Sequence, residues 1–429
     1  MSSEGTSEMS EDSNEKSALV PRLRFPEFRK AEEWEHKDLG PYLKEYSERV
    51  STDTELPIYS STRTGLKPQK DYFDNRELVN DGEYGIVPDG LFVYRHMSDD
   101  GTFKFNINRT GGPIAVSKEY PVFATVNLHQ DFLLHLLNDG EEFKKVALAQ
   151  KKGGTRTRLY LNVLRAWKAL LPSYSEQQKI ADCLSSLDDL ITVETQKLDA
   201  LKTHKEGLMQ QLFPREGETI PQLRFPEFQA AGEWVCEELT SCLEKVIDYR
   251  GKAPPKSESG VPLITAKNVR FGWLDMSCDE YIDEDEYEDW MSRGIPKAGD
   301  ILFTTEAPLG NAAFFPSTGK FALGQRIITL RTRTKKCLSG FLFQSLLGPQ
   351  MQKEIDFHST GSTAKGIKST VFVNLSFHYP KIPEQQKIAD FLSSLDELIT
   401  AQSQKIDALK SHKKGLMQQL FPVLDEVPA

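Results

Sequence analysis

The chain has 429 residues, of which 53 are lysine or arginine and 63 are aspartate or glutamate, giving a formal net charge of −10. This length is sufficient for two or three domains, and the acidic balance taken alone argues weakly against a polyanionic partner. Five cysteines show no CxxC spacing, and we find neither an apolar run of about 18 residues nor a signal-peptide pattern. We therefore expect a protein of the reducing cytoplasm without a disulfide framework or a zinc ribbon.

The sequence opens with an acidic stretch, residues 1–20, that contains five acids, one lysine and few apolar side chains. Such a composition is typical of a disordered tail, because too little apolar surface is available to offset the cost of ordering the chain. We assign residues 1–20 to a disordered acidic tail.

Two segments of the sequence occur twice. The motif "PRLRFPEFRKAEEW" at residues 21–34 returns as "PQLRFPEFQAAGEW" at residues 221–234, with 10 of 14 positions identical. The segment "EQQKIADCLSSLDDLITVETQKLDALKTHKEGLMQQLFP" at residues 176–214 returns at residues 384–422, with 31 of 39 positions identical. The regions that lie between them are not repeated. The order of short motif, variable region and long segment therefore occurs twice, at offsets of 200 and 208 residues.

The variable regions, residues 35–170 and 235–380, carry mixed strand and helix signals. "DGLFVY" (residues 89–94) and "GDILFTT" (residues 299–305) are typical of strands that leave a turn, whereas "HQDFLLHLLNDGEEFKKVALAQ" (residues 129–150) has helical spacing. Each variable region is therefore predicted to be an α+β domain.

The long repeated segments have apolar residues at alternating steps of four and three over more than four heptads. A sustained period of 3.5 residues predicts a coiled-coil seam. Ser175 and Gln178 predict a capping box at the start of the first helix, and Pro214 and Pro422 end the two helices. The expected seam residues are Ile180, Leu184, Leu187, Ile191, Leu198, Leu201, Ile388, Leu392, Leu395, Ile399, Ile406 and Leu409.

The two long helices are expected to pair with each other in antiparallel orientation, because a matching seam within one chain has a high effective concentration. Polar residues occupy four seam positions, at Glu194, Lys205, Gln402 and Lys413. They either fix register and orientation or lie where the seam opens to solvent.

The organisation also closes on itself. The first helix leads through "LFPREGETIPQLRFPEF" into the second copy, and the second helix ends in "LFPVLDEVPA" as if to meet "LVPRLRFPEF" near the start of the chain. We predict a pseudo-two-fold, nearly circular arrangement. The predicted parts are 21–172 and 215–382 for the variable domains, 173–214 and 383–422 for the helices, and 423–429 for a C-terminal tail.

The two copies return to register at the end of each variable region, in "KKGGTRTRLYLNVL" (residues 151–164) and "STGSTAKGIKSTVF" (residues 359–372). Glycine-bearing loops with hydroxyls and cations suit a phosphate backbone, and the alternative is an ordinary solvated loop. Arg156 and Arg158 are replaced by Ala364 and Gly366, as expected if the two loops meet different DNA.

Patterns for catalysis or metal binding are weak. "GSTAKGIKS" fails as a Walker A motif because Ile367 stands where the lysine must follow the glycine. Asp89 and Glu142 lie more than fifty residues apart and make a poor nuclease site, and the eight histidines show no HExxH pattern. The acidic run at residues 279–289 lacks EF-hand spacing. We predict neither a metal site nor a catalytic residue.

Together these features resemble the specificity subunit of type I restriction–modification enzymes. The resemblance covers nearly the whole chain after the acidic tail and rests on "LRFPEF" with its downstream Trp, on "EQQKIAD…LSSLD" with "HK.GLMQQLFP", and on "GDILFTTEAPLG" with "GSTAKGIK". The first variable domain departs from the last two motifs, with "DGLFVYRHMSDDG" and "GGTRTRLYL".

The resemblance implies an α+β protein in which two target-recognition domains each read one half of a split sequence in double-stranded DNA, spaced by the two helices. It implies no catalysis and no cofactor for this chain itself. Two methyltransferase subunits that bind S-adenosylmethionine, and restriction subunits that use ATP and Mg, are the implied partners. The residues then expected at DNA are Lys151, Lys152, Thr155, Arg156, Arg158, Thr363, Lys365 and Lys368, with Arg95 and Arg326 at predicted strand ends.

An adaptor protein is the alternative: a duplicated coiled coil whose variable domains bind two proteins. Strongly salt-dependent DNA binding, or its absence, distinguishes the two functions.

Overall fold

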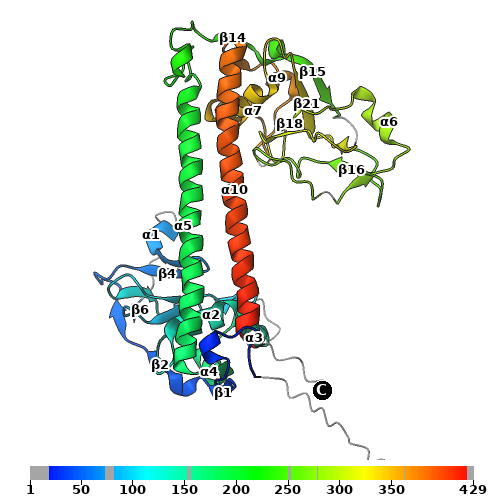
Figure 1. Cartoon of the computed structure of the whole chain (residues 1–429). Helices are drawn as coiled ribbons and strands as arrows, with labels where there is room; N and C mark the ends of the chain where they lie inside the picture. Colours follow the sequence, from blue (N-terminus) through cyan, green and yellow to red (C-terminus); the bar gives the residue numbers. More distant parts are fainter. Residues whose placement is uncertain are drawn as a thin grey trace, which may run out of the picture. The chain divides into compact units, whose positions relative to one another are not determined.

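The computed structural model describes residues 19–72, 82–151, 156–249, 253–277, 279–362 and 364–422. The chain forms two compact units, Met1–Glu194 with Lys405–Ala429 and Thr195–Gln404. Both division points fall inside the long helices α5 (Tyr174–Leu212) and α10 (Ile382–Leu420), so each unit contains one half of each helix (Figure 1).

The first unit is built on a four-stranded sheet of order β2-β11-β7-β9 and a three-stranded sheet of order β10-β6-β3. Two-residue β8 and β12 form a separate antiparallel pair, as do β4 and β5. Its strands are β1 (Glu35–Asp38), β2 (Leu43–Tyr46), β3 (Arg49–Ser51), β4 (Tyr59–Thr62), β5 (Gly65–Pro68), β6 (Glu83–Val87), β7 (Phe92–Tyr94), β8 (Met97–Ser98), β9 (Phe105–Ile107), β10 (Ile114–Ser117), β11 (Val122–Thr125), β12 (Thr157–Arg158) and β13 (Lys168–Leu171). Its helices besides the long pair are α1 (Gln69–Tyr72), α2 (Gln130–Asp139), α3 (Glu141–Leu148), α4 (Leu161–Ala166) and the 3₁₀ turns η1 (Pro26–Phe28) and η2 (Gly40–Tyr42).

The second unit repeats the main sheet although its sequence differs. Its four-stranded sheet has the order β15-β21-β18-β19, and a three-stranded sheet has the order β17-β16-β20. The strands are β14 (Val235–Glu238), β15 (Leu243–Asp248), β16 (Val261–Ile264), β17 (Tyr281–Ile282), β18 (Ile301–Thr304), β19 (Ala312–Phe314), β20 (Ala322–Leu323), β21 (Ile327–Thr332) and β22 (Ser376–Tyr379). The helices are α6 (Tyr287–Trp290), α7 (Ser339–Leu347), α8 (Pro349–Phe357), α9 (Ser369–Phe372) and the 3₁₀ turns η3 (Pro226–Phe228), η4 (Leu239–Cys242) and η5 (Met291–Arg293). The prediction of two α+β domains is confirmed.

The segment of helical spacing at residues 129–150 forms two helices, α2 and α3, that meet at Gly140. A Cβ on Gly140 would lie 2.3 Å from the carbonyl oxygen of Leu136, so only glycine permits this tight junction. In the second unit α7 and α8 meet at Gly348, followed by Pro349 at the first helical position.

In both units the short repeated motif is joined by a bidentate ion pair to the first turn of a long helix. The Arg24 guanidinium donates to both carboxylate oxygens of Glu176 at 2.7 Å, and Arg224 donates in the same way to Glu384 at 2.7 Å. The same guanidinium of Arg24 also donates to the carbonyl oxygen of Ala31. These contacts explain why "LRFPEF" and "EQQK" are repeated together: they form one structural joint.

The strand pairs that flank each variable region share one register. Glu35 of β1 faces Leu171 of β13, and Val235 of β14 faces Tyr379 of β22. These are corresponding positions at the two repeat offsets. The frame that holds a variable domain is therefore the same in both units.

The predicted closure of the chain is present in the first unit. The Leu23 amide donates to the carbonyl oxygen of Gln419 at the end of α10, as the Leu223 amide donates to Gln211 at the end of α5 in the second unit, both at 2.9 Å. The Trp34 ring packs edge-on against Phe421, with 5.9 Å between ring centroids. The second helix thus meets the motif near the start of the chain as the first helix meets the second motif.

Halves of α5 and α10 pair in antiparallel orientation within each unit. In the first unit Asp188 contacts Lys413 at 2.7 Å and Glu194 pairs with Lys405. Residue numbers therefore increase along α5 in the direction in which they decrease along α10. In the second unit Lys205 pairs with Asp396 at 2.6 Å.

The expected seam residues are all buried or half-buried. The polar seam residues do not lie where the seam opens to solvent: Glu194 and Lys205 are each 9% exposed and Gln402 is 7% exposed. Glu194, Lys205 and Lys413 each have a charged partner on the facing helix. That they fix register and orientation stays a prediction.

The capping prediction for the first helix is wrong. Helix α5 begins at Tyr174, so Ser173 precedes the helix and its hydroxyl accepts a 3.4 Å hydrogen bond from the Glu176 amide. Ser175 already lies in the first turn, where its side chain is past the N-cap position.

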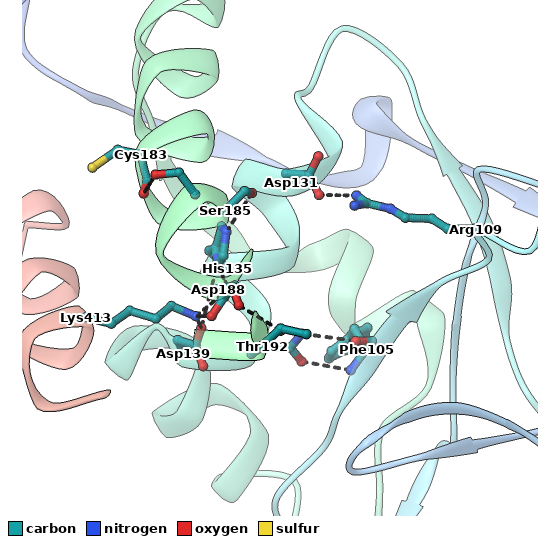
Figure 2. A network of polar contacts seen from close by, with 12 residues as sticks. Phe105, Arg109, Asp131, His135, Asp139, Cys183, Ser185, Asp188, Thr192 and Lys413 are labelled. Atoms are coloured by element: carbon teal, nitrogen blue, oxygen red, sulfur yellow. Dashed lines mark hydrogen bonds and ion pairs between the residues drawn. The ribbon is translucent and has the colours of Figure 1, made fainter. Parts of the chain in front are cut away.

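A polar network in the first unit joins α2 to both long helices (Figure 2). The Lys413 ammonium of α10 contacts Asp188 of α5 and lies 3.1 Å from Asp139 of α2. The buried His135 imidazole lies 3.7 Å from Asp139 and 3.4 Å from the Ser185 hydroxyl. Burial opposes ionisation of Asp139, but His135 and the Lys413 charge outweigh it, so the pKa of this carboxyl is lowered. The network therefore fixes the end of α10 electrostatically.

Candidate nucleic-acid interface

Three predicted arginines come together in the first unit. Arg95 follows β7, and Arg158 of β12 faces Met97 of β8 across a two-residue ladder. All three side chains, Arg95, Arg156 and Arg158, are exposed, and Arg156 lies 3.2 Å from the exposed Asp99 carboxylate. The pairing of β8 with β12 is thus what brings residues some sixty positions apart to one surface.

Two further cations belong to this surface and were missed by the sequence reasoning. Arg63 and Lys104 line a cavity of about 280 Å³ together with Arg95 and the hydroxyl side chains of Ser61, Thr62, Thr64 and Thr102. Hydroxyls beside guanidinium and ammonium groups suit phosphate oxygens. The sequence signal that could have revealed Arg63 is "SSTRTG", which forms a short hairpin of β4 and β5. Its glycine, Gly65, has φ +114°.

An acidic side chain holds Arg63 in place. Arg63 donates to Asp100 at 2.7 Å, and Asp100 also accepts from Ser98 at 2.8 Å and from the Thr102 amide at 3.0 Å. Hydrogen bonds from the hydroxyl and amide of Thr102, with those of Ser98 and Arg63, lower the pKa of Asp100 well below its usual range. The loop is therefore pre-organised, and its ion pairs are exposed enough to be exchanged for phosphate.

The second unit joins the two motifs that the sequence singled out. Gly366 forms bridges with Glu306 and Thr360, and the Ile367 amide donates to the Thr305 carbonyl oxygen at 2.9 Å. The stretch at residues 299–310 and the described residues 364–368 thereby form one surface. Arg326 pairs with Glu306 at 3.0 Å, and its carbonyl oxygen accepts from the Thr305 amide at 3.1 Å.

The other predicted cations of the second unit lie at the same surface. Lys365 pairs with Asp356 and lines a cavity of about 370 Å³ with Ala307, Pro308 and Gln352. Lys368 is exposed directly before α9. Lys151 of the first unit is also exposed, and the predicted residues Lys152, Thr155 and Thr363 lie outside the described residues.

One hydrogen bond establishes that the two surfaces correspond. The Leu159 amide donates to the His96 carbonyl oxygen at 2.8 Å, as the Ile367 amide donates to Thr305 at 2.9 Å. Leu159 and Ile367 are both buried and stand 208 residues apart. Around this shared anchor the exposed side chains differ: Arg158 corresponds to Gly366, and Tyr160 corresponds to Lys368.

The weak catalytic candidates have structural partners. The Asp89 carboxylate accepts from the Gly111 amide at 2.9 Å, and Glu142 pairs with Lys145 at 3.4 Å. Across the part of the chain that the structure describes, no three His, Cys, Asp or Glu side chains are grouped so that they could hold a metal ion. None of the helices in the described ranges is long and apolar enough to cross a membrane.

Residues 57–203 and 252–411, more than half of the chain, match the type I restriction modification DNA specificity domain. The chain belongs to this family. It is 25% identical over 436 residues to the type I restriction enzyme MjaVIII specificity subunit of Methanocaldococcus jannaschii, with 93% of each chain covered. The MjaIX specificity subunit of the same organism is 29% identical over 163 residues, covering 38% of this chain and 37% of the relative.

Two solved structures share the fold. The crystal structure of a type I restriction-modification S subunit from M. genitalium has a TM-score of 0.57 at 12% identity and covers 95% of this chain and 100% of that one. A chain from a structural study of the assembly and conformational transition of a type I R-M system has a TM-score of 0.52 at 15% identity, covering 90% of this chain and 97% of that one. At these identities the likeness concerns the fold alone.

Proposed function

We propose that this chain is the specificity subunit of a type I restriction–modification complex and that its two variable domains read the two halves of a bipartite DNA site. One observation carries the proposal. Both domains are flanked by strand pairs of the same register, and in both a corresponding amide, of Leu159 or Ile367, donates the same hydrogen bond. Their loops nevertheless differ at corresponding positions, as with Arg158 and Gly366. A shared framework with different exposed loops is expected of two domains that recognise different DNA sequences.

The paired helices act as the spacer in this proposal. Each is a continuous element of 39 residues, which corresponds to about 58 Å at 1.5 Å per residue. That length exceeds one turn of duplex DNA, about 34–36 Å. A fixed gap between the two half-sites is the expected consequence.

Catalysis and cofactors belong to partner subunits in this proposal. Two methyltransferase subunits would bring S-adenosylmethionine, and restriction subunits would bring ATP and Mg, with the whole complex in the cytoplasm. Apolar side chains that stay exposed on the long helices support partner docking there: Leu190 is 40% exposed, Val193 60% and Leu398 55%. Leu190 and Leu398 occupy corresponding positions, as expected if each helix offers the same surface to one of two identical partners.

The test is to co-express the chain with a cognate methyltransferase subunit and to map methylated adenines across genomic DNA. The variable part of the first unit, residues 43–166, is then exchanged for that of a relative, leaving β1 and β13 in place so that the frame survives. We expect a split motif with a fixed gap, of which only one half changes. If no adenine mark depends on the chain, the DNA-reading function is wrong and the variable domains should be tested as protein-binding modules.

A further inference from the structure

A turn in the second unit exposes two aromatic side chains. It follows β16 and has the sequence "TAKNVRFGWLDM" at residues 265–276, which we call the aromatic turn. Phe271 and Trp273 flank Gly272 at its tip and are 53% and 57% exposed. All five tryptophans of the chain are described, and of these Trp273 alone is exposed. Aromatic surface gathered at one turn and left in water indicates an interaction site.

Hydrogen bonds hold the aromatic turn in one conformation. The Arg270 amide donates to the Trp273 carbonyl oxygen at 2.9 Å, and the Asp275 amide donates to the Asn268 carbonyl oxygen at 2.7 Å. The Asn268 side chain in turn donates to the Asp275 carbonyl oxygen at 3.1 Å. Gly272 has φ +92°, a conformation that glycine adopts without strain. Because the turn is already ordered, its rings can bind a partner at a small cost in conformational entropy.

The aromatic turn lies beside the loop at residues 305–310, which belongs to the candidate interface of the second unit. The Gly272 amide donates to the Ala312 carbonyl oxygen at 3.0 Å, and the Asn311 side chain donates to the Val269 carbonyl oxygen at 2.9 Å. Asn311 and Ala312 directly follow that loop in sequence. The aromatic turn is therefore continuous with the candidate interface.

The first unit has a hairpin at the corresponding place in its fold. This is the hairpin of β4 and β5, which carries Arg63 at the candidate interface. In both units the chain that leads into the hairpin or turn pairs in parallel with a neighbouring strand, Ile58 with Ala115 of β10 and Leu263 with Ala322 of β20. The aromatic turn therefore stands where the first unit presents Arg63.

A side-chain contact supports the same correspondence. In each unit an asparagine at the edge strand of the four-stranded sheet donates to the backbone of the hairpin or turn. Asn106 of β9 donates to the Thr62 carbonyl oxygen at 3.2 Å, as Asn311, directly before β19, donates to Val269. The first unit thus presents a cation where the second unit presents two aromatic rings.

We propose that Phe271 and Trp273 form a wedge that opens one base step of the second half-site and stacks on the bases there. Base faces are covered by their neighbours in an intact duplex, so aromatic stacking requires that one step opens, and the new contact offsets the cost of unstacking. Lys267 and Arg270, which are exposed beside the rings, suit the flanking phosphates. The wedge rests on the proposed DNA-reading function and adds a deformation of the DNA to it.

The affinity of the complex with a methyltransferase subunit for duplex DNA that carries the mapped split motif tests the wedge. We expect Trp273→Ala or Phe271→Ala to weaken binding about tenfold and to leave the slope of log K against log salt unchanged, because stacking releases no counterions. Trp273→Phe should retain most of the affinity. Trp273→Lys should weaken binding, whereas a purely electrostatic surface would gain from the added cation. The matched control is Ile295→Ala, which removes a 55% exposed apolar side chain before the opposite end of β18 and should bind as the native chain does.

A scan with abasic DNA distinguishes a wedge from a surface contact. Each duplex lacks one base, at successive positions of the second half-site. At the opened step the native complex should bind several-fold more tightly than to the intact duplex, because one base no longer has to be unstacked. The double variant Phe271→Ala with Trp273→Ala should lose this gain. The absence of any position with tighter binding, or a gain that persists in the double variant, would overturn the proposal.

The outcomes separate the wedge from the DNA-reading function. A native complex that binds the motif no better than a duplex with a scrambled second half-site would contradict the DNA-reading function itself. A native complex that is specific, with variants that match it, would contradict the wedge alone. Variants that assemble poorly with the methyltransferase subunit but bind DNA normally once assembled would assign the aromatic turn to protein docking, which also contradicts the wedge.

Discussion

Arg24 and Glu176 lie 152 residues apart in sequence and form a buried bidentate ion pair, with 7% and 1% of their side chains exposed. The pair recurs as Arg224 and Glu384, with 8% and 2% exposed. In each unit it joins the short repeated motif to the first turn of a long helix. The hydrogen bonds that the Arg24 guanidinium donates to Glu176 raise the pKa of Arg24.

Removing one member of this pair should be costly. Arg24→Ala leaves the buried Glu176 carboxylate uncompensated, and we expect unfolding of the first unit to become easier by about 3 kcal/mol. Thermal and urea unfolding monitored by Trp34 measures the change. The matched control is Lys179→Ala, which removes an exposed ion pair with Glu27 at the same joint and should cost less than about 1 kcal/mol.

A double variant separates the attraction between Arg24 and Glu176 from the cost of burying one of these charges without its partner. Arg24→Met with Glu176→Met removes both charges, so it should be less destabilised than Arg24→Ala. A double variant that loses at least as much stability as the two single variants together would show that the joint depends on the directional hydrogen bonds of Arg24, including those to Ala31 and Glu32.

The two corresponding lysines of the seam should differ in importance. Lys413 lies between two carboxylates, Asp188 and Asp139, whereas Lys205 pairs with Asp396, which also accepts from Gln344 at 2.8 Å. Lys413→Met leaves two facing carboxylates without their cation, and Lys205→Met leaves one that keeps an amide donor. Allowing for the partial exposure of these acids, we expect losses of about 2 and about 1 kcal/mol. Equal losses, measured by urea unfolding, would contradict this account of the network.

The same network should make stability depend on pH. The native pKa of Asp139 lies below its ordinary value, so its contribution is full above that ordinary value, about 3.9, and is lost as pH falls through the native pKa. The difference in Tm between the native chain and Asp139→Asn should therefore be largest near neutral pH and shrink below about pH 4. Asp131→Asn on the same helix, which removes the exposed pair with Arg109, controls for loss of a carboxylate from α2. A difference that stays constant down to pH 3 would contradict the assignment.

Much of the fold could be predicted because its signals are local or repeated. The seam period specified α5 and α10, and the two repeat offsets predicted the closure that Leu23 and Gln419 make. The break at Gly140 was missed because it depends on the approach of the Leu136 carbonyl oxygen, which spacing alone does not reveal.

The candidate interface was less predictable because it depends on tertiary contacts. Arg156 and Arg158 stood out through their glycine-bearing loop. Arg63 and Lys104 carry no motif, and they join the surface only because β4, β5 and β9 place them around one cavity. The acidic partners Asp99 and Glu306 were also invisible, since ion pairs between distant segments leave no pattern in one sequence.

The arginines of the first unit should contribute to DNA affinity without changing the second half-site. In the complex with a methyltransferase subunit, Arg63→Ala, Arg156→Ala or Arg158→Ala should each weaken binding several-fold and reduce the slope of log K against log salt by about 1 for each phosphate that is no longer neutralised. Removal of a side chain that reads a base would instead relax specificity in one half-site only. Arg49→Ala is the matched control, because Arg49 is as exposed as Arg156, pairs with Glu83 and does not line the cavity. If Arg49→Ala weakens binding as much as the others, the effect is one of net charge and this surface is not the interface.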